Sequence, residues 1–217
     1  MDLLTDLEFR GQIYQNTDSE GLTDRLAEGP ITAYCGFDPT ADSMTVGNLA
    51  TIMLLCRVQR SGHRAIALVG GGTGLIGDPS GKSEERNLNT GDTVAEWSDN
   101  VRGELERFLD FDGSNPALVV NNYDWLGDIQ MIDFMRDVGK HFPISYMLAK
   151  DSVDSRLQSG ISYTEFSYMV LQAYDFLKLN EAYDCQLQIG GSDQWGNITA
   201  GIDLIRRSNG NKAYGLT

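Results

Sequence analysis

The stretch YCGFDPTADSMTVGNLA, residues 34–50, has side chains and a turn suited to holding a nucleotide. An apolar run breaks at Asp38, and a helical pattern restarts near Asn48. The first N–H groups of a helix are unpaired and lie at the positive end of its dipole, so they can bind phosphate. Thr40, Thr45 and Asn48 can each donate a hydrogen bond there. The alternative is an ordinary strand–helix turn with polar capping residues.

A second segment, GGGTGLIGDPSGKSEER over residues 70–86, is rich in glycine and can approach a ligand closely. It is not a P-loop, because Ile76 occupies the first glycine position of that pattern. Its dinucleotide-type glycine spacing is weak, because Pro79 follows where a helix would run. A carboxylate suits an ammonium group, and cations suit a phosphate chain. The loop carries such groups at Asp78, Lys82 and Arg86. The alternative is a solvated glycine-rich loop.

A third segment, SYTEFSYMVLQAYDFLK, predicts a helix with a polar stripe. Ser162 and Glu165 have the spacing of a capping box, which marks the start of the helix. Tyr168, Gln172 and Asp175 follow at i, i+4 and i+7, and therefore share one face. Such a stripe could line a cavity that binds a polar small molecule. The alternative is a solvated helix face.

A fourth segment, QIGGSDQWGN over residues 188–197, indicates a strand, a double glycine and a new helix opened by Ser192 or Asp193. Asp193 and Gln194 fall at the carboxyl end of the strand, where a ribose hydroxyl or a substrate carboxylate could be bound. Simple capping of the helix by Asp193 is the alternative.

The elements between these segments predict an α/β fold with a doubly wound parallel sheet. Helical patterns cover 48–60 and 93–110. Ligands bind beyond the carboxyl ends of the strands in such a sheet, so the four segments are expected to meet at one edge. Residues 123–160 interrupt the alternation as a helical insertion, and the final YGLT predicts another strand. The four earlier strands are predicted at 31–37, 65–71, 117–122 and 185–191.

Composition limits the class of protein. The 217 residues contain 17 Lys and Arg against 31 Asp and Glu, a net charge of −14, which argues against a broad basic face for nucleic acid. Cys35, Cys56 and Cys185 have neither metal-ligand nor disulfide spacing, so we expect free thiols and a cytoplasmic location. No signal sequence is visible, and no apolar run approaches the roughly 20 residues that a membrane span needs.

These motifs resemble those of bacterial tyrosyl-tRNA synthetases, a family of class I aminoacyl-tRNA synthetases. The resemblance covers nearly the whole sequence and implies a Rossmann-like catalytic core, an obligate homodimer, and an insertion at 123–160 that contributes to the dimer interface. Phe142, Ile144 and Met147 would otherwise face water. The resemblance is carried by YCGFDPTADS, ALVGGGTGLIGDPSGKSEER, NNYDWLG, DVGKHF, GISYTEFSYMVLQAYDF and LQIGGSDQWGNITAGIDLIRR.

The family's reaction, implied by this resemblance, has two steps. ATP and L-tyrosine give tyrosyl-adenylate and pyrophosphate, and the tyrosyl group then moves to the 3′ end of tRNA(Tyr). ATP is a substrate, and Mg²⁺ accompanies it without dedicated protein ligands. No residue of these enzymes is a covalent nucleophile, so the protein acts by stabilising developing charge.

The resemblance also implies roles for individual residues. In the tyrosine site, Tyr34 and Asp175 bind the phenol hydroxyl, and Gln194 faces the substrate carboxylate. The substrate ammonium group is held by Asp78, Tyr168 and Gln172. The adenylate is held by Cys35, Gly36, Asp38, Gly47, Gly191 and Asp193. Pyrophosphate is stabilised by Thr40, Lys82 and Arg86, next to the signature turn that contains Thr45 and Asn48. The weaker assignments, to the tRNA acceptor arm, are Lys150, Arg206 and Arg207.

Two departures from the family pattern predict reduced activity. The signature His-x-Gly-His is replaced by Thr45-Val46-Gly47-Asn48, so a contact with the γ-phosphate of ATP is weakened. The mobile lysine loop, the anticodon-binding domain and the C-terminal RNA-binding domain are not in the sequence, so we expect this chain to activate tyrosine weakly or not at all and to charge tRNA barely or not at all. The alternative function is a non-catalytic module, derived from a synthetase, that binds tyrosine or adenylate. An unrelated nucleotidyltransferase with a similar sheet is a more distant alternative.

Overall fold

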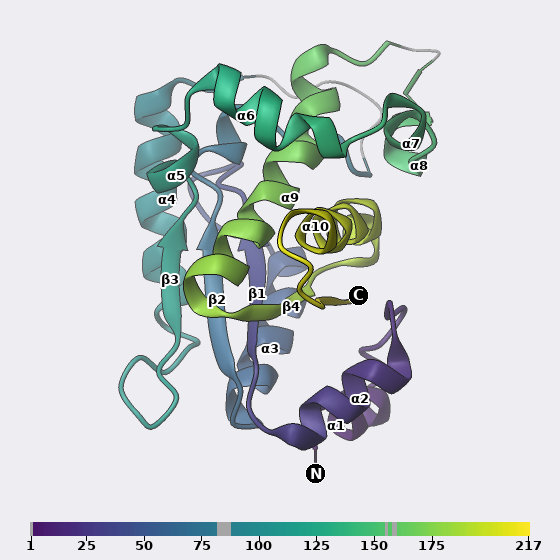
Figure 1. Ribbon diagram of the computed structural model, residues 1–217. Coiled ribbons are helices and arrows are strands. Elements are labelled where there is room, and N and C mark those ends of the chain that lie inside the picture. Colours follow the sequence, from purple (N-terminus) through teal and green to yellow (C-terminus); the bar gives the residue numbers. More distant parts are fainter. Residues whose placement is uncertain (1, 82–87, 155, 158–159) are drawn as a thin grey trace.

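The computed structural model describes residues 2–81, 88–154, 156–157 and 160–217 (Figure 1). Its centre is a parallel sheet with the strand order β3-β2-β1-β4-β5. The chain moves outward from β1 to β3 and then returns to place β4 on the other side of β1. This order confirms the predicted α/β fold, with its switch point between β1 and β4. The strands are Thr32–Phe37, Arg64–Val69, Leu118–Asn121, Cys185–Ile189 and Tyr214–Leu216.

Helices cover both faces of the sheet (Figure 1). On one face lie α3 (Val46–Arg60) and α4 (Gly91–Leu105), and on the other lie α9 (Tyr163–Tyr183) and α10 (Trp195–Ser208). Side chains alternate along β1: Cys35 packs in the cluster of α3 and α4, whereas Tyr34 packs in the cluster of α9 and α10. Neighbouring residues of one strand therefore pack on opposite faces of the sheet.

The N-terminal segment covers the β5 edge of the sheet. Helices α1 (Leu3–Phe9) and α2 (Ser19–Glu28) flank residues 14–17, which run beside β5. The Tyr14 N–H donates to the Thr217 carbonyl at 2.6 Å, and the Thr17 N–H donates to the Gly215 carbonyl at 3.1 Å. The predicted strand at YGLT is confirmed, and residues 14–17 occupy the edge that it would otherwise leave open.

Residues 123–160 connect β3 to α9 through short helices at the top of Figure 1. The sequence prediction that Phe142 and Met147 would face water outside a dimer interface is wrong. They are 8% and 4% exposed, because they pack against other parts of the same chain. Ile144 remains 61% exposed. None of the described helices is both long enough and apolar enough to cross a membrane. The helices of this segment are α5 (Tyr123–Leu126), α6 (Met131–Asp137), η2 (Gly139–His141), α7 (Ile144–Leu148) and α8 (Asp151–Asp154).

Candidate functional site

A cavity of about 630 Å³ opens at the carboxyl ends of β1 and β4, the switch point of the sheet. The four chemistry-bearing segments of the sequence converge on it. Lys82 and Arg86 lie outside the described residues. The described residues predicted for tyrosine, ATP and the signature turn all line the cavity: Tyr34, Cys35, Gly36, Asp38, Thr40, Thr45, Gly47, Asn48, Asp78, Tyr168, Gln172, Asp175, Gly191, Asp193 and Gln194.

The inner end of the cavity contains an unpaired hydroxyl and a buried carboxyl group. Tyr34 and Asp175 are each 1% exposed, and the Tyr34 hydroxyl has no hydrogen-bond partner among the described residues. Asp175 accepts from Trp125 Nε1 at 2.7 Å and from Asn122 Nδ2 at 2.9 Å. Burial raises the pKa of Asp175 to about 8, against the lowering effect of these two donors. A ligand hydroxyl could donate to Asp175 and accept from Tyr34.

A hydrogen-bond chain fixes Asp175 relative to the rest of the cavity. Asn122 Nδ2 also donates to Thr73 Oγ1 at 2.9 Å, and Thr73 Oγ1 donates to Asp38 Oδ1 at 2.6 Å. The Tyr168 hydroxyl donates to the other Asp38 oxygen at 2.7 Å. A bound ammonium group would therefore meet the acceptor oxygens of Tyr168 and Asp38 together. Such a network holds the site in one geometry before any ligand enters.

Sequence reasoning gave no role to Asn122, Trp125 or Thr73. Asn122 directly follows β3, and that position at the carboxyl end of a strand is the signal that could have identified it. The link from Trp125 to Asp175 spans 50 residues, so it depends on how α5 is placed against α9.

The polar groups at the mouth of the cavity are linked in pairs. Asp78 accepts from Gln194 Nε2 at 2.7 Å and from the Ser80 N–H at 2.9 Å. Gln194 Nε2 also lies 2.9 Å from Asp193 Oδ2. The loop that follows β2 and the turn that follows β4 are therefore joined across the cavity. An ammonium group could bind to Asp78. A substrate carboxylate near Gln194 would need one of the two amide hydrogens that Gln194 now donates to Asp78 and Asp193.

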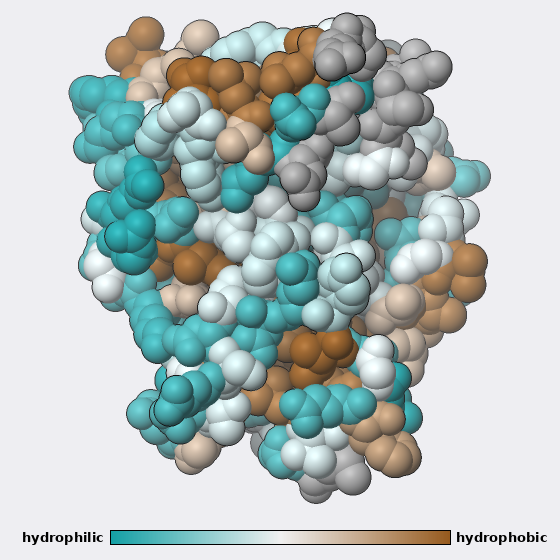
Figure 2. Space-filling model, turned by 90° about the vertical axis from the view of Figure 1, so that its right-hand side faces the viewer, coloured by the Kyte–Doolittle hydropathy of each residue, from teal (hydrophilic) through white to brown (hydrophobic). Residues whose placement is uncertain are grey.

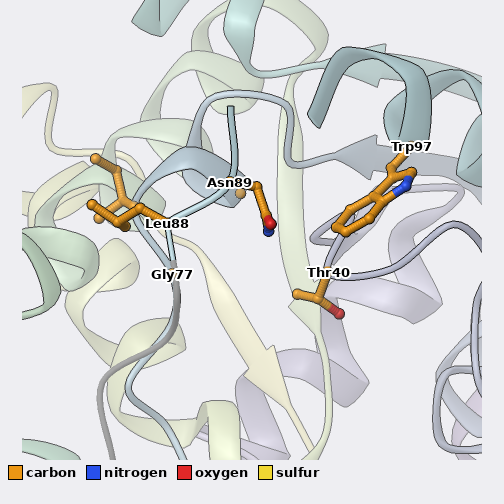
Figure 3. A pocket seen from close by; sticks show the side chains of 7 residues that line it. Thr40, Gly77, Leu88, Asn89 and Trp97 are labelled. Carbon is orange, nitrogen blue, oxygen red and sulfur yellow. The ribbon is translucent and has the colours of Figure 1, made fainter. Parts of the chain in front are cut away.

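A smaller cavity of about 250 Å³ adjoins the first at Thr40, which lines both. Figure 3 shows the Asn89 carboxamide pointing into the space between Leu88 and Trp97. The backbone N–H groups of Ile76 and Gly77 are already bonded to the Thr73 carbonyl, so they are not available to a ligand. The polar side chains offered by the described lining are Thr40 and Asn89.

The three residues assigned to tRNA do not line the main cavity and already have protein partners. Lys150 donates to Thr199 Oγ1 at 3.0 Å, near the start of α10. Arg206 pairs with Asp203 at 3.0 Å, and Arg207 donates to the His141 carbonyl at 2.8 Å. Thr199 and Arg206 are about 10 Å apart along the helix at 1.5 Å per residue. Lys150 therefore lies near the start of α10 and the two arginines near its end, and their role stays a prediction.

The described residues contain no group of three or more His, Cys, Asp or Glu side chains that could hold a metal ion. Cys35, Cys56 and Cys185 are buried free thiols. Burial raises the pKa of Cys35 to about 12, so this thiol is protonated and is not a nucleophile at neutral pH.

The sheet order, the switch-point cavity and the glycine-rich loop beside it define an α/β core of the nucleotide-binding kind. The family model described as tRNA synthetases class I (W and Y) matches residues 26–217, so the chain belongs to that family. It is 61% identical to the tyrosine–tRNA ligase of Bacillus caldotenax and 63% identical to tyrosine–tRNA ligase 1 of Bacillus subtilis strain 168. Both alignments cover 100% of this chain and 52% of the relative, so the chain spans about half the length of these proteins.

A solved structure supports the same assignment. The C-terminally truncated mitochondrial tyrosyl-tRNA synthetase of Aspergillus nidulans superposes with a TM-score of 0.88 at 28% sequence identity. The match covers 100% of this chain and 68% of that one.

Proposed function

We propose that this chain forms the catalytic part of a tyrosine–tRNA ligase, which activates L-tyrosine with ATP and transfers it to the 3′ end of tRNA(Tyr). One observation carries the proposal: Asp175 and Tyr34 both line the inner end of the cavity, and the Tyr34 hydroxyl has no hydrogen-bond partner among the described residues. A phenol hydroxyl would bond to both groups, whereas a phenylalanine ring would leave the Tyr34 hydroxyl without a partner and the buried Asp175 with only its two protein donors. The similarity to tyrosine–tRNA ligases supports the same substrate.

The cavity supports activation without a covalent enzyme intermediate. The tyrosine carboxylate attacks the α-phosphorus of ATP, the bond to the β-phosphate breaks, and pyrophosphate leaves. Asp78, Tyr168 and Gln172 orient the ammonium group, and Gln194 lies beside the carboxylate. Thr40 lines both cavities, which supports a role as a donor to the departing phosphates. Positioning and fixed dipoles supply the catalysis.

ATP would bring its own magnesium. Its phosphates are hard oxygen ligands, and Mg²⁺ in such sites is commonly held by substrate phosphates and water. Three buried free thiols suit a reducing compartment, and we place the protein in the cytoplasm.

Exchange of labelled pyrophosphate into ATP tests the activity. We expect exchange that depends on tyrosine and is far weaker with phenylalanine in a longer protein that contains this chain. Calorimetry with tyrosine gives a second readout. Binding of tyrosine without exchange in the longer protein favours the alternative, a non-catalytic binding module. If the folded chain binds no tyrosine, both readings fail.

We also propose a homodimer, formed through the segment between β3 and α9. Apolar side chains on its surface support this: Met131 and Ile132 of α6 are 73% and 74% exposed, and Ile144 is 61% exposed. Figure 2 shows brown, apolar side chains gathered along the top of the molecule, at the height of α6 and α7 in Figure 1. Monomeric proteins seldom leave such a patch uncovered.

Ile132→Glu tests the dimer by placing a charge on this patch. We expect sedimentation equilibrium to show a dimer for the unaltered chain and a monomer for the variant, with an unchanged circular dichroism spectrum. Asp133→Ala on the same helix is the control and should remain dimeric. A monomeric unaltered chain at micromolar concentration would contradict the proposal.

A further inference from the structure

The side-chain oxygen of Asn48 accepts two hydrogen bonds from one residue. The backbone N–H and the hydroxyl of Thr45 each lie 2.9 Å from Asn48 Oδ1. A carboxamide oxygen has two lone pairs, so both are occupied. The orientation of the Asn48 amide is thereby determined: its oxygen faces Thr45, and its amino group faces away.

The amino group of Asn48 is available to a ligand. Asn48 lines the main cavity with Gly47 and with Thr51, one turn further along α3. Cys35 lies on the same wall and interacts with Thr51. The structure shows no hydrogen bond from Asn48 Nδ2 to another described residue. Its two hydrogens can therefore be donated to the sugar or phosphate oxygens of a nucleotide.

The Thr45 hydroxyl, by contrast, has one hydrogen, and Asn48 already accepts it. A phosphate oxygen near neutral pH needs a donor, so Thr45 cannot serve it without giving up the bond to Asn48. Because Thr45 is exposed, water competes for its N–H and hydroxyl groups. Two hydrogen bonds from Thr45 therefore restrain the Asn48 amide more firmly than one would. Thr45 thus differs from a residue that contacts phosphate directly.

We infer that Thr45 is a positioning residue, whose hydroxyl holds the Asn48 carboxamide with its amino group turned toward the bound nucleotide. The inference rests on the proposed function, because it assumes that the main cavity holds the adenylate. It assigns the donor of this turn to Asn48 and gives Thr45 an indirect role. The signature turn would then contact the nucleotide through Asn48, and Thr45, the N-cap residue of α3, would orient that side chain.

Four variants test the inference: Thr45→Val, Thr45→Ser, Asn48→Ala and the double variant Thr45→Val/Asn48→Ala. The probe is a tyrosyl-adenylate analogue with a sulfamate in place of the phosphate, titrated by calorimetry, with tyrosine alone as the control ligand. We expect Thr45→Val to weaken analogue binding about 2- to 10-fold and Asn48→Ala to weaken it about 3- to 30-fold. Thr45→Ser, which keeps the hydroxyl, should bind as the unaltered chain does.

The double variant separates an indirect role from a direct one. If Thr45 acts through Asn48, the double variant binds the analogue no more weakly than Asn48→Ala alone. Effects that multiply would mean that Thr45 touches the ligand itself, which overturns the inference. Unchanged analogue binding in Thr45→Val, with a lowered melting temperature, would assign the bonds to helix capping alone and also overturn it.

Failure of the proposed function would look different. The unaltered chain would then bind neither tyrosine nor the analogue, before any variant is compared. Tyrosine affinity itself should be the same in all four variants, because the phenol and ammonium contacts lie on β1 and α9 and in the loop after β2.

Discussion

Asp175→Asn is expected to lower kcat/KM for tyrosine activation by about 10- to 150-fold and to leave the fold intact. A hydrogen bond to a charged group contributes about 1.5–3 kcal/mol, and about 1.4 kcal/mol corresponds to a tenfold change in rate. The asparagine keeps an oxygen for the Trp125 donor, but its new amino group would face the amino group of Asn122. The variant therefore loses the acceptor for the phenol and disturbs the chain that leads to Thr73. Pyrophosphate exchange at varied tyrosine concentration measures the effect.

Tyr34→Phe is the matched comparison, because it removes the other half of the phenol site. We expect a smaller loss, about 2- to 12-fold, from a neutral hydrogen bond worth about 0.5–1.5 kcal/mol. The unliganded protein should not lose stability, since the hydroxyl has no partner there among the described residues. Discrimination against phenylalanine should fall in both variants. If either variant lost activity on tyrosine and on phenylalanine equally, the assignment of the phenol site would be wrong.

The same carboxyl group should make tyrosine binding depend on pH. Burial raises the pKa of Asp175 to about 8, and the charge of Asp38 adds to the increase. The pKa values of Tyr34 and Tyr168 are raised well above 10, so both stay neutral in this range. A phenol hydroxyl donates best to the ionised carboxylate, so binding releases a proton from Asp175. Affinity should therefore increase from pH 6 toward pH 8, by at most about tenfold per unit, and Asp175→Asn should remove this component.

The sequence predicted the parts of the site that follow from local periodicity. Helical spacing puts Tyr168, Gln172 and Asp175 on one face. The bond between Thr45 and Asn48 is also local, and the spacing of a capping box could have revealed it. The bonds from Asn122 and Trp125 to Asp175 were not predictable in this way, because they depend on the packing of distant segments.

The burial of Phe142 and Met147 was likewise not predictable from local sequence patterns. An apolar pattern predicts that a face will be covered, but it does not say by what. In the structure, other parts of the same chain cover these two residues, and the exposed apolar surface lies at Met131, Ile132 and Ile144. The candidate dimer surface thus keeps Ile144 from the sequence prediction, but Met131 and Ile132 take the place of Phe142 and Met147.

Arg156→Met is expected to lower the free energy of unfolding by about 3–5 kcal/mol, because it leaves a buried carboxylate without its cation. Arg156 Nη2 lies 2.9 Å from Glu165 Oε2, and the two side chains are 5% and 0% exposed. Glu165 lies in the first turn of α9, the helix that carries Tyr168 and Asp175. The ion pair therefore ties the end of the segment between β3 and α9 to a wall of the site.

The double variant Arg156→Met/Glu165→Leu shows whether the loss comes from the unpaired charge. Well-packed apolar residues often replace a buried ion pair without cost, so this variant should recover most of the lost stability. Arg102→Met, which breaks the exposed pair with Glu106, is the control and should leave the urea midpoint nearly unchanged. Urea unfolding followed by circular dichroism measures all three variants. A small loss in Arg156→Met, or no recovery in the double variant, would mean that packing rather than charge governs this contact. Tyrosine affinity in the double variant then tests the link to function, because an intact α9 should bind tyrosine normally even without the ion pair.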